Sequence, residues 1–467
     1  MFVSNTDHRY PPGPKGKPFL GNLLEFRRDP LQFLVRLARE YGDVASFRIG
    51  SQKIVQISHP DLIKDVLVTN HRNFRKTGVL ERARPVLGNG LVTADGEFHR
   101  RQRKLMQPAL NRQRIASYGT VMTDCAARMS ERWRHGETVD VFQEMLHLSL
   151  EIVTRALFNI DLESEADEIE KALTIVLEHF NHLLVRPHAK LFSKLPSPSN
   201  RRFQRAQEYL DDIVYRMINE RRLSREDRGD VLSMLLLAQD EEGDGRGMSD
   251  QQIRDEVMTL LTAGHETVAS ALTWTWYCLS QNPDAEAALH GELDSVLEGR
   301  PPTTEDLPEL TCTEMVFAET MRLFPPVWGI TRRVIDDYEM DSYTIPAGTV
   351  IGMTQYVMHH DSRFYTDPYE FDLFRWSPEI RAQRPKYSYF PFGGGPRLCI
   401  GEPFAWVEGI LAIATLAQHW QMQFVPGHRV TFQPLLTLRP KDGLPMALQR
   451  RQPIKRSRTT DMIFSVP

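Results

Sequence analysis

A ten-residue segment near the C-terminus, residues 392–401, constrains this chain more than any other part of the sequence. It reads FGGGPRLCIG, so Cys399 lies in a loop that is rich in glycine and stiffened by proline. Glycines permit positive φ angles and let a backbone approach a flat ligand without Cβ clashes. Arg397 and the N-terminus of a following helix both favour a thiolate over a thiol. A lone cysteine is more often a buried structural residue, but the whole segment favours a thiolate that binds a metal.

The overall composition gives no indication of a nucleic-acid-binding, a disulfide-rich secreted or a membrane-spanning protein. The 467 residues carry 57 basic and 61 acidic side chains, a net charge of −4, so we expect no nucleic-acid partner. The four cysteines are scattered and form no CxxC pair, which favours a reducing compartment, and we expect a cytoplasmic protein. No run of about 18 apolar residues occurs, so we expect neither a transmembrane anchor nor a secretory leader.

The residue patterns predict one mainly α-helical domain with minor β-sheets. Nothing marks an interdomain linker, so we expect the domain to span residues 1–449, with a proline-rich start at 10–18 and a mobile basic tail at 450–467. Period-two patterns predict strands, and polar or proline-containing stretches predict loops. The expected hairpin strands are Val44–Ile49 and Lys53–Ser58, the β-rich end is 422–449, and the loops are 78–92, 186–200 and 240–248.

The longest helical pattern follows Ser249. The spacing of this residue to Gln252 fits a capping box, in which each residue satisfies a backbone amide of the other. The pattern continues to about Gln281 and stops before Asn282-Pro283, because proline cannot continue a helix. We therefore expect a helix of about nine turns.

The segment Ala263-Gly264-His265-Glu266-Thr267 lies within this helix. A glycine inside a helix costs about 1 kcal/mol relative to alanine, and either close helix packing or room for a ligand would explain Gly264. The Thr267 hydroxyl can reach the carbonyl of Ala263, and such a bond opens a helix locally. His265-Glu266 begins like the zinc motif HExxH, but the residue at the second ligand position is alanine, so a zinc site is excluded.

Glu319 and Arg322 have the spacing of an ion pair on one helix face. The spacing alone says little, because Glu97 and Arg100 share it. The sequence Leu-Phe-Pro-Pro follows Arg322 at once, and a further arginine, Arg375, lies in a later segment. A glutamate between two arginines can accept bidentate, charge-assisted hydrogen bonds. We expect this triad to be structural rather than catalytic.

These motifs, in this order, resemble those of the cytochrome P-450 superfamily of haem-thiolate monooxygenases. The pattern Phe392-x-x-Gly395-x-Arg397-x-Cys399-x-Gly401 is similar to the haem-binding loop of that family, in which a cysteine thiolate is the proximal iron ligand. The likeness spans the whole predicted domain and indicates a soluble member of bacterial type. It implies the single-domain P-450 fold, with haem b (iron protoporphyrin IX) between the Cys399 loop and the long helix.

The resemblance also implies roles for residues elsewhere in the chain. Thr267 and Glu266 would be catalytic and would bring protons in from solvent, with Val268 where threonine or serine is usual. Cys399 would bind the iron, and Phe392, Arg397 and Gly401 would belong to the cofactor-binding loop. Ala263 and Gly264 would lie beside the haem, and its propionates would be bound by Arg397, Arg332, His99 and Arg103, with Arg333 as a substitute for Arg332.

The triad of Glu319, Arg322 and Arg375 would support the haem site structurally, with Leu373 where proline is usual. The implied substrate pocket, next to Thr437, consists of Val327, Trp328, Gly329, Ile330, Leu435 and Leu436.

The implied activity is insertion of one oxygen atom from O2 into a lipophilic substrate such as a fatty acid or terpenoid, because the pocket segments are apolar. The sequence after Cys399 is too short for a flavin or iron–sulfur domain. We therefore expect a separate ferredoxin or flavodoxin, with its reductase, to supply electrons. Arg100, Arg101 and Lys104 are expected on the face where this donor docks.

Two alternatives to a monooxygenase remain open. A haem-thiolate isomerase or peroxygenase needs no electron donor, but such branches often lose the threonine that this chain retains as Thr267. A non-enzymatic haem-based gas sensor needs no proton relay, so Glu266 counts against it. Separately, the stretch from Leu183 to Phe192 interleaves apolar and basic residues, and it fits a membrane contact, an access lid or core packing.

Overall fold

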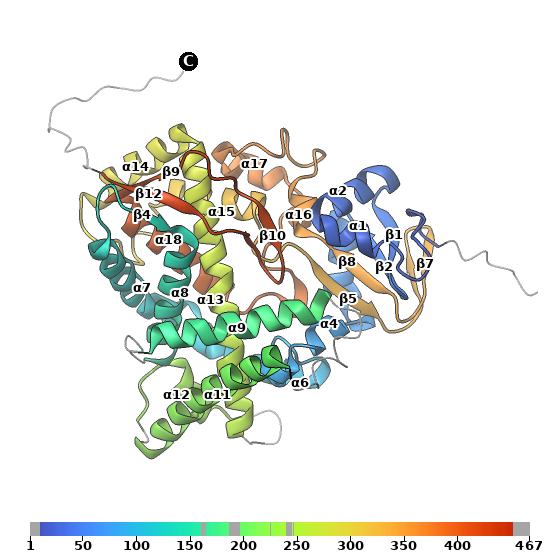
Figure 1. The fold of residues 1–467 in the computed structure, drawn as a ribbon, viewed down its shortest axis with the longest axis horizontal. Coiled ribbons are helices and arrows are strands. Elements are labelled where there is room, and N and C mark those ends of the chain that lie inside the picture. The colour runs from blue at the N-terminus through green and yellow to red at the C-terminus, as the bar shows by residue number, and fades with distance from the viewer. Residues whose placement is uncertain are drawn as a thin grey trace, which may run out of the picture.

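Helix α13, Asp250–Gln281, is the longest element and crosses the middle of the molecule (Figure 1). The predicted capping box is present, because Ser249 accepts from the Gln252 amide and the Gln252 side chain accepts from the Ser249 amide. The helix ends where Pro283 begins α14, Pro283–Leu297. The computed structural model describes residues 10–159, 165–185, 197–224, 226–239, 245 and 247–451.

Helices packed against α13 form the larger hydrophobic core, which we call the helical core. Helices α8 (Val141–Phe158), α11 (Pro198–Ser224), α15 (Thr311–Leu323) and α18 (Glu402–Ala417) all contact α13. Because α8 and α18 are apolar over much of their surface, they bury most of their residues and need a partner on several sides. The further helices of this part are α6 (Gly96–Met106), η3 (Gln107–Leu110), α7 (Arg112–Arg132), α9 (Ala166–Val185) and α12 (Val231–Leu237).

A five-stranded sheet forms the second part of the molecule, at the right of Figure 1. The strand order is β1 (Val44–Ile49), β2 (Gln52–Ile57), β8 (Val350–Met353), β5 (Ile330–Val334) and β3 (Phe74–Arg75), with β2 and β8 parallel. The predicted hairpin is thus confirmed, one residue earlier in its second strand. Buried residues of these strands form the sheet-side core. The short elements of this part are α1 (Leu23–Arg28), α2 (Pro30–Tyr41), α3 (Pro60–Lys64), η1 (Asp65–Thr69), η2 (His71–Asn73), β6 (Tyr338–Met340), β7 (Tyr343–Ile345) and α16 (Gln355–His359).

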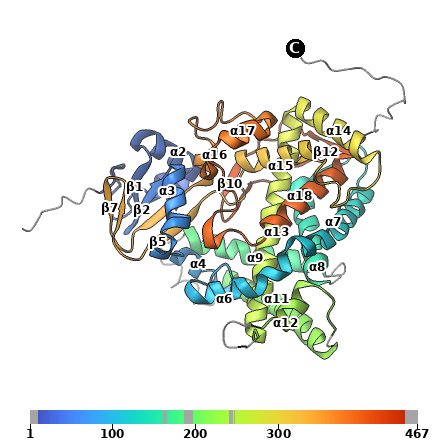
Figure 2. The ribbon, with the colours of Figure 1, turned by 180° about the vertical axis from the view of Figure 1, so that it is seen from behind.

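The β-rich C-terminal end predicted at 422–449 is confirmed. Strand β12 (Pro445–Arg450) pairs with β9 (Trp420–Phe424) and β4 (Thr138–Asp140), while β10 (Phe432–Pro434) and β11 (Leu438–Pro440) form a separate hairpin. This β10–β11 hairpin lies between the five-stranded sheet and α13 in both views (Figure 1 and Figure 2). It therefore joins the two parts of the molecule.

The predicted loops need correction. The segment 78–92 contains two short helices, α4 (Gly78–Glu81) and α5 (Arg84–Leu87), because Pro85 at the start of α5 has the backbone angle that a first helical turn needs. Pro198, expected in a loop, begins α11 for the same reason. Of the tail predicted at 450–467, Arg450 belongs to β12 and residues 452–467 lie outside the described residues. Residues 186–196 of the loop predicted at 186–200, and residues 240–244 and 246 of the loop predicted at 240–248, also lie outside them. The remaining short elements are η4 (Leu373–Trp376), α17 (Pro378–Gln383), η5 (Lys386–Ser388) and η6 (Gly395–Arg397).

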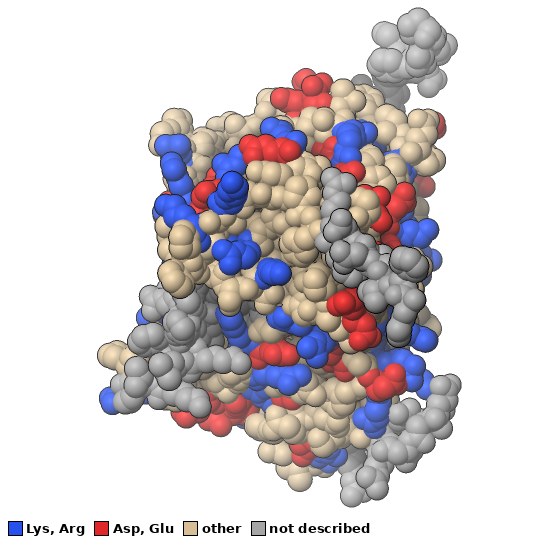
Figure 3. Space-filling model, turned by 90° about the vertical axis from the view of Figure 1, so that its right-hand side faces the viewer, with Lys and Arg blue, Asp and Glu red and all other residues tan. Residues whose placement is uncertain are grey.

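Two surface properties bear on possible partners. Among the described residues, every helix is too short or too polar to cross a bilayer. Basic and acidic side chains are interspersed over the face that carries the β1–β2 hairpin (Figure 3), as the nearly balanced composition implies.

Candidate active site

The loop that carries Cys399 is shaped by glycine. Gly393 and Gly395 have φ angles of 76° and 67°. A Cβ at Gly395 would lie 1.9 Å from the carbonyl oxygen of Leu67 in η1, so a side chain cannot be accommodated there. The Cys399 amide then donates to the Phe392 carbonyl at 3.0 Å and closes the loop just before α18 begins. The glycine requirement predicted from sequence is confirmed at these two positions, whereas Gly401 has an ordinary φ of −86°.

The Cys399 side chain is exposed, although protein surrounds it closely enough for burial to raise the pKa of its thiol. These two facts agree if the sulfur faces an internal hollow. The backbone amides of Gly401 and Glu402, at the N-terminus of α18, and the guanidinium group of Arg103 oppose this effect and lower the pKa. The charge of Glu402 adds to the effect of burial, and the pKa of the free thiol stays raised, but these donors would stabilise the sulfur as an anionic metal ligand.

The buried middle of helix α13 is interrupted at the predicted segment. Ala263 is exposed and Gly264 and Thr267 are partly exposed, whereas almost all of the helix from Ile253 to Leu279 is buried. Thr267 Oγ1 donates to the Ala263 carbonyl over 2.7 Å, which confirms the predicted bond. Helix α18 follows the Cys399 loop directly and contacts α13, so the cysteine loop is connected to α13 through α18.

The surroundings of Gly264 support close helix packing, which is one of the two explanations for a glycine at this position. A Cβ at this position would lie 3.0 Å from Cγ2 of Val153 in α8, which is tighter than almost all real Cβ contacts. The glycine therefore lets α8 and α13 approach each other. Gly264 is nevertheless partly exposed, as Thr267 is, so its implied place beside the haem stays a prediction.

Glu266 is buried, with 2% of its surface exposed, so it does not itself reach the solvent from which it was expected to bring protons. Its Oε1 accepts a hydrogen bond from Thr437 Oγ1 at 2.6 Å and lies 3.6 Å from Nη1 of Arg439. Burial raises the pKa of this carboxyl group, while Thr437 and Arg439 lower it. The carboxyl of Glu266 is thus directed toward the β10–β11 hairpin.

The predicted cations converge beside the cysteine loop. Arg397 forms an ion pair with Asp95 and donates to the Phe74 carbonyl at 2.9 Å. Arg103 donates to the Leu398 carbonyl at 2.6 Å, next to Cys399. Arg332 and His99 are buried. Arg333, the proposed substitute, instead donates to the Gly348 carbonyl at 2.8 Å on the far side of its strand.

Burial and mutual repulsion shift the pKa values of this cluster. Burial, together with Lys76, Arg397 and Arg103, lowers the pKa of His99 to about 4. Burial and Arg397 lower the pKa of Arg332 to about 10. Because Arg332 and Arg397 repel each other and Asp95 pairs with Arg397, the cluster fits an anionic ligand, and a neutral His99 could donate a ring N–H to it.

Lys76 is a member of this cluster that sequence reasoning missed. Its Nζ donates to the Leu91 carbonyl at 2.7 Å, and burial and Arg397 lower its pKa to about 7. Its amide donates to Asp95 at 2.7 Å. Lys76 and Asp95 do not belong to a recognisable motif, so the sequence gave no signal for either residue. Lys76 comes close to Arg332 because β3 pairs with β5.

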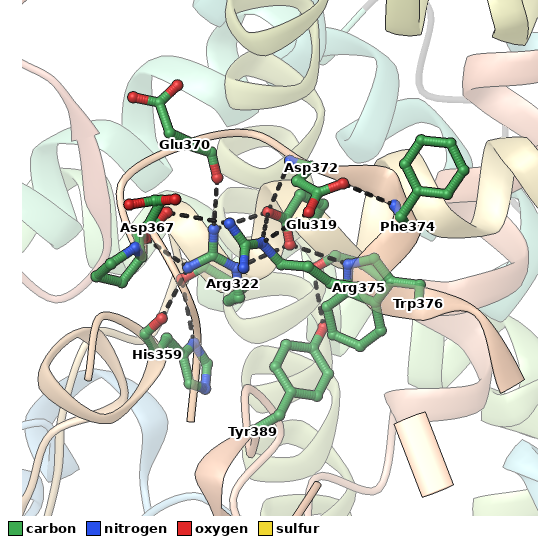
Figure 4. Close-up of polar contacts among 12 residues, drawn as sticks. Glu319, Arg322, His359, Asp367, Glu370, Asp372, Phe374, Arg375, Trp376 and Tyr389 are labelled. Carbon is green, nitrogen blue, oxygen red and sulfur yellow. Dashed lines mark hydrogen bonds and ion pairs between the residues drawn. The ribbon is translucent and has the colours of Figure 1, made fainter. Parts of the chain in front are cut away.

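The buried triad is assembled as predicted (Figure 4). Arg322 donates to both carboxyl oxygens of Glu319 at 2.8 and 2.7 Å, and Arg375 Nε lies 3.3 Å from Oε1. Trp376 Nε1 and the Asp372 amide add hydrogen bonds of 2.9 and 3.0 Å to the same carboxyl group. Arg322 also donates to the backbone carbonyls of His359, Pro368 and Glu370.

The predicted pocket segments lie together. Trp328 Nε1 donates to the Leu435 carbonyl at 2.8 Å, and the Leu438 amide donates to the Pro326 carbonyl at 2.9 Å. Ile330 approaches the cysteine loop, since a Cβ at Gly393 would be 3.8 Å from its Cδ1. The pocket residues of both segments are half-buried, and these are Val327, Trp328, Gly329, Ile330, Leu435 and Leu436.

Known proteins resemble this chain over almost its whole length. The family model for "Cytochrome P450" matches residues 11–444. Cyclooctatin synthase of Streptomyces melanosporofaciens is 44% identical over 92% of this chain and 94% of its own, and pentalenene oxygenase of Streptomyces avermitilis is 36% identical over 97% and 98%. Cyclooctat-9-en-7-ol 5-monooxygenase of Streptomyces melanosporofaciens is 39% identical over 89% and 90%.

The fold agrees with these relatives. The crystal structure of the cytochrome P450DA haem domain superposes with a TM-score of 0.86, at 26% identity, over 96% of this chain and 99% of the other. The mainly helical, single-domain fold predicted from the sequence is therefore confirmed. With a matching family model, oxygenase relatives and the same fold, this chain belongs to the cytochrome P450 family of monooxygenases.

Proposed function

We propose that this protein inserts one oxygen atom from O2 into a lipophilic, terpenoid-type substrate, with electrons from a separate redox protein. The observation that carries the proposal is the accessible thiol of Cys399, in a glycine-shaped loop that leads into α18, together with accessible residues at 263–267 in the otherwise largely buried middle of α13. Cys399 would supply a thiolate ligand and Thr267 a hydroxyl group, and these two groups suit activation of oxygen at a haem iron.

The residues present fit haem b, iron protoporphyrin IX. Cys399 Sγ would bind the iron, and the loop of Phe392 and Gly401 would hold the thiolate. Arg397, Arg332 and Lys76 would bind the two propionates as cations, and His99, whose lowered pKa leaves it neutral near pH 7, would donate a ring N–H. Arg103 instead orders the loop through the Leu398 carbonyl. When bound, the haem supplies the iron centre at which O2 is reduced.

The chain's own residues hold and move protons. The Thr267 hydroxyl donates to the Ala263 carbonyl, so the oxygen lone pairs of Thr267 can accept a hydrogen bond at the accessible face of the helix. Burial raises the pKa of Glu266 and so favours its neutral form, which can act as a proton donor. The triad of Glu319, Arg322 and Arg375 holds the backbone beside the site and takes no part in proton transfer.

The substrate is proposed to be a terpenoid hydrocarbon or one of its alcohols. The names of the relatives describe oxidation of pentalenene and of cyclooctat-9-en-7-ol, which are compounds of this kind. The two pocket segments, 327–330 and 435–436, offer apolar side chains and no charge.

The electron donor is proposed to be a ferredoxin or flavodoxin, served by its reductase. Helix α6 carries Arg103, which binds the carbonyl next to Cys399, on its inner side. Arg100 and Lys104 are exposed on the same helix, and Arg101 is half-buried. An acidic partner docked here would lie close to the thiolate ligand and would be attracted by these charges.

The test is reconstitution of the haem-loaded protein with a ferredoxin, its reductase, NADPH and terpenoid hydrocarbons under 18O2. One labelled oxygen per product, dependent on the donor proteins, is the expected result. Rearranged product without labelled oxygen would establish an isomerase, and oxidation by peroxide alone at an undiminished rate would establish a peroxygenase. Tight binding of O2 with no product from any substrate would indicate a sensor.

A further inference from the structure

The β10–β11 hairpin brings two polar side chains to Glu266, Thr437 from its turn and Arg439 from β11. Thr437 donates from Oγ1 to Glu266 Oε1 at 2.6 Å, and Nη1 of Arg439 lies 3.6 Å from the same oxygen. Thr437 is almost completely buried, with 1% of its surface exposed. The sequence placed this residue beside apolar pocket residues, but its hydroxyl is committed to the carboxyl group on α13.

The hairpin holds these two side chains in fixed positions. Arg439 faces Gln433 across the strand pair, and its Nε donates to Gln433 Oε1 at 3.0 Å. Leu438, between Thr437 and Arg439, accepts from Trp274 Nε1 of α13 at 2.8 Å. The hairpin is therefore attached to α13 both at Glu266 and about two turns further along the helix.

The two oxygens of Glu266 have unequal surroundings. Oε1 has both polar neighbours, whereas Oε2 is buried and has no hydrogen-bond partner among the described residues. In a neutral carboxyl group the carbonyl oxygen is the better acceptor and the proton resides on the other oxygen. The contacts of Glu266 thus distinguish an acceptor oxygen from a proton-bearing oxygen.

We propose that Thr437 and Arg439 are positioning residues that fix Oε1 of Glu266 as the acceptor and leave Oε2 to carry the transferable proton. This inference rests on the proposed role of Glu266 as a proton donor. Thr437 orients the neutral acid. Arg439 stabilises the carboxylate that remains after the proton leaves and until the group is protonated again, so both protonation states of Glu266 have a partner.

The electrostatics of Glu266 agree with this assignment. Burial raises the pKa of the carboxyl group, and the hydrogen bond from Thr437 and the charge of Arg439 lower it. Arg439 is the charged group that acts on Glu266 in the described part of the chain. Loss of either partner should therefore raise the pKa of Glu266 further and keep the acid protonated to higher pH.

The experiment measures the carboxyl C=O stretching band of Glu266 by infrared spectroscopy of the haem-loaded protein, titrated across neutral pH. The band is assigned as the one that Glu266→Gln removes. Thr437→Val keeps the shape of the side chain but loses the hydroxyl. It should raise the stretching frequency and move the titration midpoint upward by about one pH unit, while Thr437→Ser should restore both. Arg439→Gln should move the midpoint in the same direction.

The matched control is Thr275→Val, which removes a buried threonine hydroxyl from α13 that binds the Ala271 carbonyl instead. It should leave the Glu266 band unchanged. The ratio of product formed to electrons consumed should fall at high pH, and the pH of this fall should move with the infrared midpoint in each variant. An unchanged band and midpoint in Thr437→Val, or failure of serine to restore them, would overturn the positioning role. The infrared band reports on Glu266 whether or not product forms. An altered band with no labelled product would therefore count against the proposed function and not against this inference.

Discussion

Arg322 donates two parallel hydrogen bonds to Glu319, of 2.8 and 2.7 Å, although neither side chain has any exposed surface. The Arg322 guanidinium also spans three backbone carbonyls in the segment 359–370. A buried ion pair gains little over an apolar pair, but loss of one partner leaves the other charge without compensation. The pair therefore fixes the backbone that leads to the cysteine loop.

Replacement of Glu319 with alanine is expected to destabilise the protein by about 3–5 kcal/mol, because Arg322 and Arg375 lose their common acceptor. Urea unfolding and haem content measure the effect. The control is Glu97→Ala, since Glu97 and Arg100 have the same sequence spacing but both are largely exposed. That change should cost no more than about 0.5 kcal/mol. Equal effects of the two substitutions would show that burial does not decide the role of the motif.

Replacement of Cys399 with alanine should abolish the red-shifted Soret band of the reduced carbon monoxide complex, because that band requires a thiolate ligand to iron. The absorption spectrum measures it directly. Cys125 is buried, and burial raises its pKa to about 12, so Cys125→Ala should keep the band. A band retained without Cys399 and lost without Cys125 would reverse the assignment.

Thr267→Val should leave haem content near the parent value and divert electrons to hydrogen peroxide, because the proton path loses its hydroxyl while the shape of the side chain is kept. The ratio of product to NADPH consumed measures this diversion. Thr273→Val is the matched control, since Thr273 makes the same bond to a carbonyl four residues back but is fully buried. If both variants remain coupled, Thr267 has no part in proton delivery.

Stability should fall with pH through Glu408, a buried acid in α18. Burial raises the pKa of Glu408 to about 8, from 4.5 for an exposed glutamate, so the folded protein holds this proton more tightly than the unfolded chain. The stabilisation is complete below about pH 4.5 and is lost as the pH rises toward 8, by at most about 1.4 kcal/mol per unit. The free energy of unfolding of Glu408→Gln should therefore decline less than that of the parent protein between about pH 5 and pH 8. A parallel decline in parent and variant would contradict this.

Charge reversal at Arg100, Arg101 and Lys104 should slow reduction by an acidic ferredoxin and flatten its dependence on salt, because electrostatic attraction raises the association rate and is screened by ions. Stopped-flow reduction across a series of ionic strengths measures both. Reversal of three exposed arginines on α11, Arg201, Arg202 and Arg205, is the matched control. Similar losses in both variants would indicate a general charge effect and no docking site on α6.

Much of the fold was predictable where the determining interactions are local. The capping box at Ser249 and Gln252 and the stop at Pro283 depend on neighbouring residues, and both are present. The bond from Thr267 to Ala263 spans one helical turn and was equally accessible to prediction. The short helices α4 and α5 were missed, because four-residue elements carry too few positions to show a period.

The candidate site was less predictable where it depends on contacts between distant segments. Lys76 and Arg439 reach the site through strand pairing and a turn, and no local pattern marks either residue. At Gly264 the sequence left two explanations open. Only the distance to Val153, on another helix, favours packing.

The cysteine loop is built into both hydrophobic cores. Tyr387 and Phe390, just before it, belong to the sheet-side core, whereas Phe392 and Phe404, on either side of the cysteine, pack in the helical core. Gly395 meanwhile touches the backbone of η1. The environment of the thiol therefore exists only while the helical part and the sheet part of the molecule are packed together, and it reports on that packing. Heat or denaturant that separates the halves must disturb this loop at the same moment, so the spectrum of the bound cofactor should report the integrity of the whole fold.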